Sequence, residues 1–139
     1  MLLLDTNVLS VLLRAEPEKV VAGWISGQRS APLYTTSICQ AELWSRIAIM
    51  PVGHRRLYLE QAVYAMFVEE FDGRVLAFDD QAALAYAQIF AARRRAGRPG
   101  ATADLMIAAI AQIHAASVVT RNVRDFDGCG VPVINPWDA

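Results

Sequence analysis

The sequence is poor in cysteine and in charge, and each shortage excludes a class of protein. Cys39 and Cys129 are the only cysteines among 139 residues, too few for a disulfide framework or a cysteine-based metal site. Charged residues make up 19% of the chain and the net charge is −1. Overall charge therefore does not draw this protein to nucleic acid.

Long apolar runs are missing too. The longest candidate, residues 105–119, is interrupted by Gln112 and His114 and is too short to span a bilayer. The N-terminal apolar run lacks the length and the basic flank of a secretory signal. We therefore expect a cytoplasmic protein with no membrane partner.

Several catalytic motifs are absent as well. The chain contains neither the G-x-S-x-G of serine hydrolases nor a phosphate-binding P-loop or G-x-G-x-x-G fingerprint. His54 and His114 are not spaced as a pair of metal ligands. These absences leave acid and arginine side chains as the candidates for chemistry.

Apolar residues and arginines are what the chain has in quantity. Hydrophobic residues make up 55% of it, which excludes disorder and leaves material for an apolar partner surface. Of the 13 basic residues, all but Lys19 are arginine. Arginine binds phosphate through two parallel hydrogen bonds, so the positions of these residues matter more than their sum.

Short apolar segments alternate with longer helical ones along the sequence. The pattern predicts strands over residues 2–4, 33–36, 75–78 and 117–120, with a short edge strand within 131–134. It predicts helices over residues 7–13, 18–26, 38–50, 54–70, 80–96 and 103–116. Ser37, Asp79 and Thr102 are the expected caps of three of them. This alternation indicates one α/β domain over residues 1–139, with helices on both faces of a parallel sheet.

Three acids stand where such a fold places ligands. Asp5 follows the apolar strand Leu2–Leu4, Glu42 shares a helix face with Ile38, Ser45 and Ile49, and Asp104 lies in the first turn of a very apolar helix. Each has a simpler explanation: Asp5 or its neighbours cap a helix, Glu42 pairs with Arg46, and Asp104 complements the helix dipole.

A fourth polar group, Asn122 or Asp125, follows the strand 117–120. Because parallel strands end at one edge of the sheet, this loop and Asp5 should converge. Carboxylates gathered without lysine or histidine repel one another, and a divalent cation relieves that repulsion. Oxygen-only ligands suit Mg²⁺ or Mn²⁺ rather than Zn²⁺.

Arginines also cluster at the end of the helix 80–96, whose apolar face is predicted to carry Leu84, Ala87, Gln88 and Ala91. The cluster comprises Arg93, Arg94, Arg95 and Arg98. It either complements the helix dipole or contacts phosphate, and the sequence leaves both readings open.

Five segments together resemble one protein family. They are LLLDTNVLS at 2–10, TSICQAELW at 36–44, ATADLMIAA at 101–109, VVTRNVRDF at 118–126 and VINPW at 133–137. Their order and separation resemble those of PIN-domain ribonucleases, in particular the VapC/FitB toxins of type II toxin–antitoxin systems. The resemblance covers the whole chain.

The resemblance implies a three-layer α/β/α fold with a central, mainly parallel sheet of four or five strands. It implies an endoribonuclease that hydrolyses RNA with Mg²⁺ or Mn²⁺ held by Asp5, Glu42 and Asp104. The family often has a fourth acid where this chain has Asn122, so Asp125 is expected to replace it or to act through water. Thr6 and Thr120 match family hydroxyls beside the metal. Arg121, with the cluster at 93–98, is expected to hold RNA phosphates.

The resemblance also implies partners. Such toxins form homodimers, are inhibited by a small VapB/FitA-like antitoxin whose tail occupies a hydrophobic groove, and reach DNA only through that antitoxin. Trp44 is the candidate groove residue. Two other functions compete with this one. Asn122 is compatible with a non-catalytic PIN-like module that binds RNA or protein, whereas an aspartyl phosphatase is disfavoured because Asn7 replaces the second aspartate it needs.

Overall fold

A five-stranded sheet forms the centre of the molecule. The computed structural model describes residues 1–28 and 30–138. The strands are β1 (Leu2–Leu4), β2 (Leu33–Thr36), β3 (Val75–Leu76), β4 (Ser117–Val119) and β5 (Val133–Ile134). Their order is β3-β2-β1-β4-β5, and every neighbouring pair is parallel. The prediction of a parallel sheet with an edge strand after Pro132 is confirmed, although β3, β4 and β5 are shorter than predicted.

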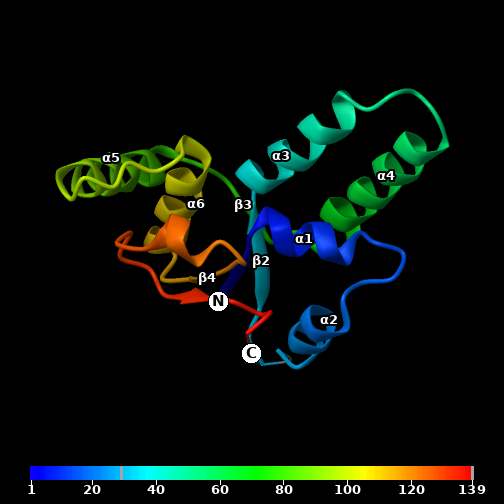
Figure 1. The fold of residues 1–139 in the computed structure, drawn as a ribbon, viewed down its shortest axis with the longest axis horizontal. Coiled ribbons are helices and arrows are strands. Elements are labelled where there is room, and N and C mark those ends of the chain that lie inside the picture. Colours follow the sequence, from blue (N-terminus) through cyan, green and yellow to red (C-terminus); the bar gives the residue numbers. More distant parts are fainter. Residues whose placement is uncertain (29, 139) are drawn as a thin grey trace.

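Helices cover both faces of this sheet. They are α1 (Thr6–Leu12), α2 (Lys19–Ser26), α3 (Ser37–Ala48), α4 (His54–Ala65), α5 (Asp80–Arg95) and α6 (Thr102–Ile113). Figure 1 shows α5 and α6 on one side of the sheet and α1, α2 and α4 on the other. The three-layer α/β/α arrangement is therefore as predicted. In the described part of the chain, no helix is both long and apolar enough to cross a membrane.

The strand β1 lies in the middle of the sheet because its three leucines have no polar face. Leu3 and Leu4 are completely buried, and α6 supplies a run of buried residues from Ile107 to Ala111. Burying each of the leucine and isoleucine side chains among them stabilises the fold by about 1.5–3 kcal/mol. This apolar centre holds the carboxyl ends of β1 and β4 at a defined separation.

Helix caps follow the prediction in one case and depart from it in two. Asp79 caps α5 and accepts a main-chain N–H of its first turn, as predicted. The prediction that Ser37 caps α3 is wrong, because Thr36, the last residue of β2, does so. Thr102 is likewise not a cap but the first residue of α6, after Ala101. At the β2–α3 junction, the last residue of the strand is thus also the cap of the helix, with no residue between them.

Two helices bury a different face from the one predicted. In α5 the buried residues are Ala82, Ala85, Ile89 and Arg93, whereas Leu84 is 68% exposed. In α3 they are Cys39, Leu43 and Ile47, whereas Ile49 is 86% exposed. Alanines lie on several faces of α5, so its buried face is only slightly more hydrophobic than the others. Glu42 consequently lies beside the buried face of α3 rather than inside an apolar stripe.

The predicted helix 54–70 is divided in two. The segment Met66–Glu70 continues α4 as a π-helix, in which the N–H of Phe71 reaches back to the carbonyl of Met66. Gly73 then turns the chain with a φ of 70°, a left-handed conformation that favours glycine. The end of the helical segment is thus as predicted.

Candidate active site

The helices α1, α3 and α6 begin near the same edge of the sheet, where β1, β2 and β4 end (Figure 1). The helix α3 contacts both α1 and α6. This arrangement follows from parallel pairing, since Leu4 of β1 lies beside Val119 of β4 in register. The acids predicted from three separate segments therefore meet at one edge.

Asp5 lies at the centre of this edge and is only 4% exposed. Its Oδ1 accepts the N–H of Thr6 at 2.8 Å, and its Oδ2 accepts the hydroxyl of Thr120 at 2.8 Å. Asp5 is thus the N-cap of α1, a place the sequence had offered to Thr6 or Asn7 as well. Burial raises the pKa of Asp5, while the hydrogen bonds from Thr120 and Thr6 oppose that rise.

Glu42 faces Asp5 from α3. The hydroxyl of Thr6 donates to Oε1 of Glu42 at 3.2 Å, so one threonine links both acids. Arg46, the expected partner of Glu42, donates to the hydroxyl of Ser10 instead, at 3.2 Å. Partial burial raises the pKa of Glu42, and the charge of Asp5 adds to the rise. The simpler explanation, an i,i+4 ion pair on a solvated face, does not describe this residue.

Asp104 completes the group from the first turn of α6. Burial raises its pKa to about 6, and the charges of Asp125, Asp5 and Glu42 raise it in that order after burial. An isolated acid at a helix N-terminus would be stabilised in its charged form. The dipole explanation alone therefore fails for Asp104, because the neighbouring acids and burial outweigh it.

The loop after β4 brings the fourth group. The N–H of Asn122 donates to the hydroxyl of Thr120 at 3.1 Å, and a short 3-10 helix, Val123–Phe126, follows. Asp125 is exposed on this helix, yet its charge raises the pKa of both Asp5 and Asp104. Asp125 thus lies within electrostatic reach of the acids that the sequence singled out.

The carboxylate oxygens at this edge are of the type that binds a divalent cation, but they do not form a complete coordination site. Across residues 1–28 and 30–138, no three histidine, cysteine or acidic side chains lie close enough together to hold a metal ion. The expected ligand set of Asp5, Glu42 and Asp104 is therefore not assembled in this conformation. Carboxylates without a counter-charge repel one another, and a bound cation would relieve that repulsion. Their oxygen donors and shared negative charge fit Mg²⁺ or Mn²⁺.

The arginines of the predicted phosphate-binding set lie in different surroundings. Arg93 is only 6% exposed; its Nε donates to the carbonyl of Arg98 at 2.7 Å and its Nη1 donates to the carbonyl of Asp127. The guanidinium of Arg93 thus ties the end of α5 to the loop after β4, a role the sequence did not predict. Arg93 is therefore the least accessible of the five arginines predicted to contact phosphate.

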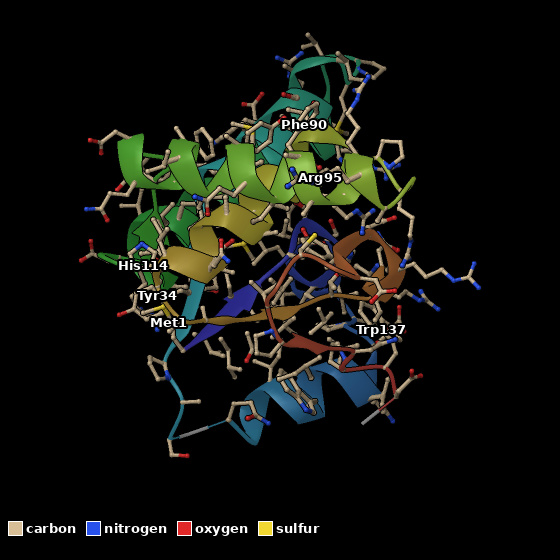
Figure 2. All side chains as sticks on the ribbon, turned by 90° about the vertical axis from the view of Figure 1, so that its left-hand side faces the viewer. Met1, Tyr34, Phe90, Arg95, His114 and Trp137 are labelled. Atoms are coloured by element: carbon tan, nitrogen blue, oxygen red, sulfur yellow. The ribbon has the colours of Figure 1, made fainter. Side chains whose placement is uncertain are left out.

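The other four arginines remain accessible. Arg98 forms an exposed ion pair with Asp127 at 2.9 Å, and Arg94 lies over the ring of Phe90. Figure 2 places Arg95 and Phe90 on α5, above the sheet. Arg121 is the second residue after β4, and its guanidinium lies 4.9 Å from the ring centre of Trp137.

Sequence reasoning missed two residues that contact Asp5. The amide of Asn7 donates to Asp5 Oδ2 at 3.3 Å, and the thiol of Cys39 lies 3.9 Å from Oδ1. Burial raises the pKa of Cys39 to about 11, so this thiol stays protonated and can donate. The sequence had marked Asn7 only as a possible helix cap and as a substitute for an aspartate, not as a contact of Asp5.

Trp44, the predicted groove residue, is half-buried on α3. It lines a hollow of about 550 Å³ with Leu57 and Tyr64 of α4. A second, larger groove of about 930 Å³ lies between α1 and the α3–α4 hairpin, and its apolar lining includes Leu13 and Tyr58. The molecule therefore has apolar hollows on both sides of that hairpin.

Comparison with known proteins agrees with the fold and the motifs. The PIN domain family matches residues 2–128. The plasmid stability protein StbB of Pseudomonas syringae pv. tomato is 44% identical over the full length of both chains. The VapC ribonuclease Y4jK of Sinorhizobium fredii is 39% identical over 99% of both.

Solved structures show the same relationship. FitAcB from Neisseria gonorrhoeae superposes with a TM-score of 0.92 at 36% identity, covering 100% of both chains. VapBC structures of toxin–antitoxin systems share the fold as well. The chain belongs to the PIN-domain family, in the group of the VapC and FitB toxins.

Proposed function

We propose that this protein is a metal-dependent endoribonuclease, the toxin of a toxin–antitoxin pair. The observation that carries the proposal is the convergence of Asp5, Glu42, Asp104 and Asp125 at one sheet edge, where burial and the charges of neighbouring acids raise the pKa of Asp5, Glu42 and Asp104. Such a group needs a cation to be fully charged at neutral pH. The name of the relative Y4jK, a VapC ribonuclease, supports RNA as the substrate.

In this proposal Asp5, Glu42 and Asp104 hold Mg²⁺ or Mn²⁺, with Asp125 or Asn122 beside them. A bound divalent ion would polarise the phosphate and lower the pKa of a water molecule. Oε1 of Glu42 is occupied by the hydroxyl of Thr6, which leaves Oε2 to orient water or to accept its proton. Thr6 and Thr120 act by orienting the acids to which they donate.

Arginines would bind the RNA strand. Arg121 lies at the carboxyl end of β4 beside the acids, whereas Arg94, Arg95 and Arg98 lie at the end of α5. Their guanidinium groups would contact phosphates on either side of the cleaved bond. The net charge of −1 means that local arginines, rather than overall charge, must supply this attraction.

We propose that the antitoxin, a protein of the VapB/FitA kind, binds the groove between α1 and the α3–α4 hairpin rather than the hollow lined by Trp44, the residue that the sequence offered for this role. This groove has an apolar floor and a basic rim that includes Arg14, Arg46 and Arg55. A glutamate at Tyr58 would place charge on the apolar lining, so Tyr58→Glu should weaken antitoxin binding at least tenfold and spare cleavage. We also propose a homodimer, which light scattering of the free protein would test. DNA would be reached only through the antitoxin.

The test is cleavage of RNA by the antitoxin-free protein. Total RNA is incubated with the purified protein and Mn²⁺, and the new ends are sequenced. Defined new ends are expected for the natural protein and for Asp80→Asn, a control in the first turn of α5. Asp5→Asn and Asp104→Asn should produce none. A variant that cleaves as well as the natural protein would remove its acid, Asp5 or Asp104, from the active site.

A non-catalytic binding module is the second candidate, favoured by Asn122 in place of a fourth acid and by the separation of the acids. Such a module would bind RNA without producing new ends. RNA retained on the protein with intact ends, with or without Mn²⁺, would favour this function over the nuclease.

A further inference from the structure

Asn7, the second residue of α1, spans the gap between β1 and β4 with its side chain. Its Nδ2 donates to the hydroxyl of Thr120 at 3.0 Å and to Asp5 Oδ2 at 3.3 Å. Its Oδ1 accepts the main-chain N–H of Arg121 at 3.1 Å. One half-buried carboxamide thus contacts the central acid and the first two residues beyond β4.

The orientation of this amide is determined by its neighbours. A carboxylate oxygen can only accept, so Nδ2 must face Asp5, and a main-chain N–H can only donate, so Oδ1 must face Arg121. In the opposite orientation, Oδ1 of Asn7 would face the carboxylate of Asp5, an acceptor against an acceptor, and Nδ2 would face the N–H of Arg121, a donor against a donor. The amide of Asn7 therefore connects an acceptor on one strand end to a donor on the other, as few side chains can.

Main-chain pairing stops short of the region that Asn7 bridges. The register of β1 with β4 ends at Leu4 and Val119, followed by one bond from the N–H of Asp5 to the carbonyl of Val119. Beyond that point the link consists of side-chain contacts, from Thr120 to Asp5 and from Asn7 to Arg121. The Asn7 bond is the one that reaches furthest into the loop.

That loop carries Asn122 and Asp125. Asp125 is close enough for its charge to act on Asp5 and Asp104, so repulsion tends to move it away from them. A neutral tether between Asp5 and Arg121 resists that movement without adding charge. Asparagine meets this requirement, whereas an acid at the same place would increase the repulsion.

We propose that Asn7 is a positioning residue, which holds the loop 121–126 against Asp5 so that Asn122 and Asp125 stay beside the acids. This inference rests on the proposed nuclease function for its effect on metal binding and cleavage. Its structural part, the tether from Asn7 to Arg121, holds whether or not the protein is a nuclease. The two parts can be tested separately.

The tether is tested by amide hydrogen exchange of the metal-free protein. Asn7→Ala should speed exchange of the Arg121 amide and of the loop 121–126 at least tenfold. Asn7→Asp keeps an oxygen for the Arg121 N–H but sets a carboxylate against Asp5, so its Arg121 amide should exchange at a rate between those of the natural protein and Asn7→Ala. The control is Gln28→Ala, which removes a carboxamide that donates to the carbonyl of Trp24 at the end of α2, far along the chain from the acids. It should leave the loop unchanged.

The positioning role is tested by calorimetric Mn²⁺ titration and by steady-state cleavage. Removing a residue that orients a metal ligand typically reduces metal affinity or activity about 10–100-fold. Asn7→Ala should weaken Mn²⁺ binding and lower kcat within that range, with KM changed less than threefold and the RNA-binding arginines intact. Gln28→Ala should match the natural protein in both measurements.

Two results would overturn the inference. Unchanged exchange of the Arg121 amide in Asn7→Ala would remove the tether, even for a protein that cleaves nothing. Faster exchange with natural Mn²⁺ affinity and natural kcat would reduce Asn7 to a structural link. Absence of Mn²⁺ binding and cleavage in the natural protein would instead contradict the proposed function, while the exchange experiment would still decide the tether.

Discussion

Replacing Asp104 with asparagine should stabilise the metal-free protein while removing its metal binding. Burial and three neighbouring acids raise the pKa of Asp104 from 3.8 to about 6. That shift would correspond to about 3 kcal/mol at 1.36 kcal/mol for each pKa unit. Asp104 is partly exposed to water, which screens the effect, so we expect about 1 kcal/mol of stabilisation at pH 7. In a domain of this size, that raises Tm by about 3 °C.

The assay is thermal unfolding with EDTA and with Mn²⁺, followed by circular dichroism. Asp80→Asn is the matched control, because Asp80 also lies in the first turn of a helix but is exposed and outside the acid group. Losing only a dipole interaction, Asp80→Asn should lower stability by about 0.3–1 kcal/mol. Added Mn²⁺ should raise the Tm of the natural protein and of Asp80→Asn, and leave that of Asp104→Asn unchanged.

The pH dependence has a definite sign. The folded pKa of Asp104 lies above its unfolded value, so the folded protein binds more protons between pH 3.8 and about 6. Its destabilising effect is full above pH 6 and disappears as the pH falls toward 3.8. The advantage of Asp104→Asn should shrink in the same window. A Tm lowered by several degrees at pH 7, without metal, would refute the reasoning and make Asp104 a structural helix acid.

Other expectations concern arginines and the loop after β4. Replacing Arg94 and Arg95 together with glutamine should weaken RNA binding and flatten its salt dependence, since fewer counterions are released; an unchanged slope would assign them to solvation. Arg93→Gln should instead cost about 2 kcal/mol of stability, because buried charged hydrogen bonds are lost, and denaturant unfolding measures this. Asp125→Ala should weaken Mn²⁺ binding and lower cleavage together, whereas Asn122→Ala should lower cleavage alone if its amide positions substrate. Calorimetry that finds natural Mn²⁺ affinity in Asp125→Ala, with natural cleavage, would remove Asp125 from the site.

The order of the elements and the positions of the acids were decided by the sequence itself. Three leucines in a row leave β1 no solvent face, so the strand had to lie in the middle of the sheet. Parallel pairing then puts the residues after β1 and β4 at one edge, whatever the details of packing. The convergence of Asp5 with the loop of Asp125 could therefore be predicted before any contact was known, whereas Glu42 and Asp104 were singled out by their helix positions and by the family resemblance.

Only the tertiary structure decided which side chains are buried and hydrogen-bonded and which are exposed to solvent. Arg93 and Arg94 are adjacent in sequence, yet α5 buries one against main-chain carbonyls and leaves the other exposed. The local sequence pattern could not distinguish these two arginines, because the faces of an alanine-rich helix differ little in hydrophobicity. Asn7 gained its partners from a strand more than a hundred residues away, through contacts that no local signal contains. Burial and long-range hydrogen bonds depend on the whole fold, and they determine the charge and the orientation of this site.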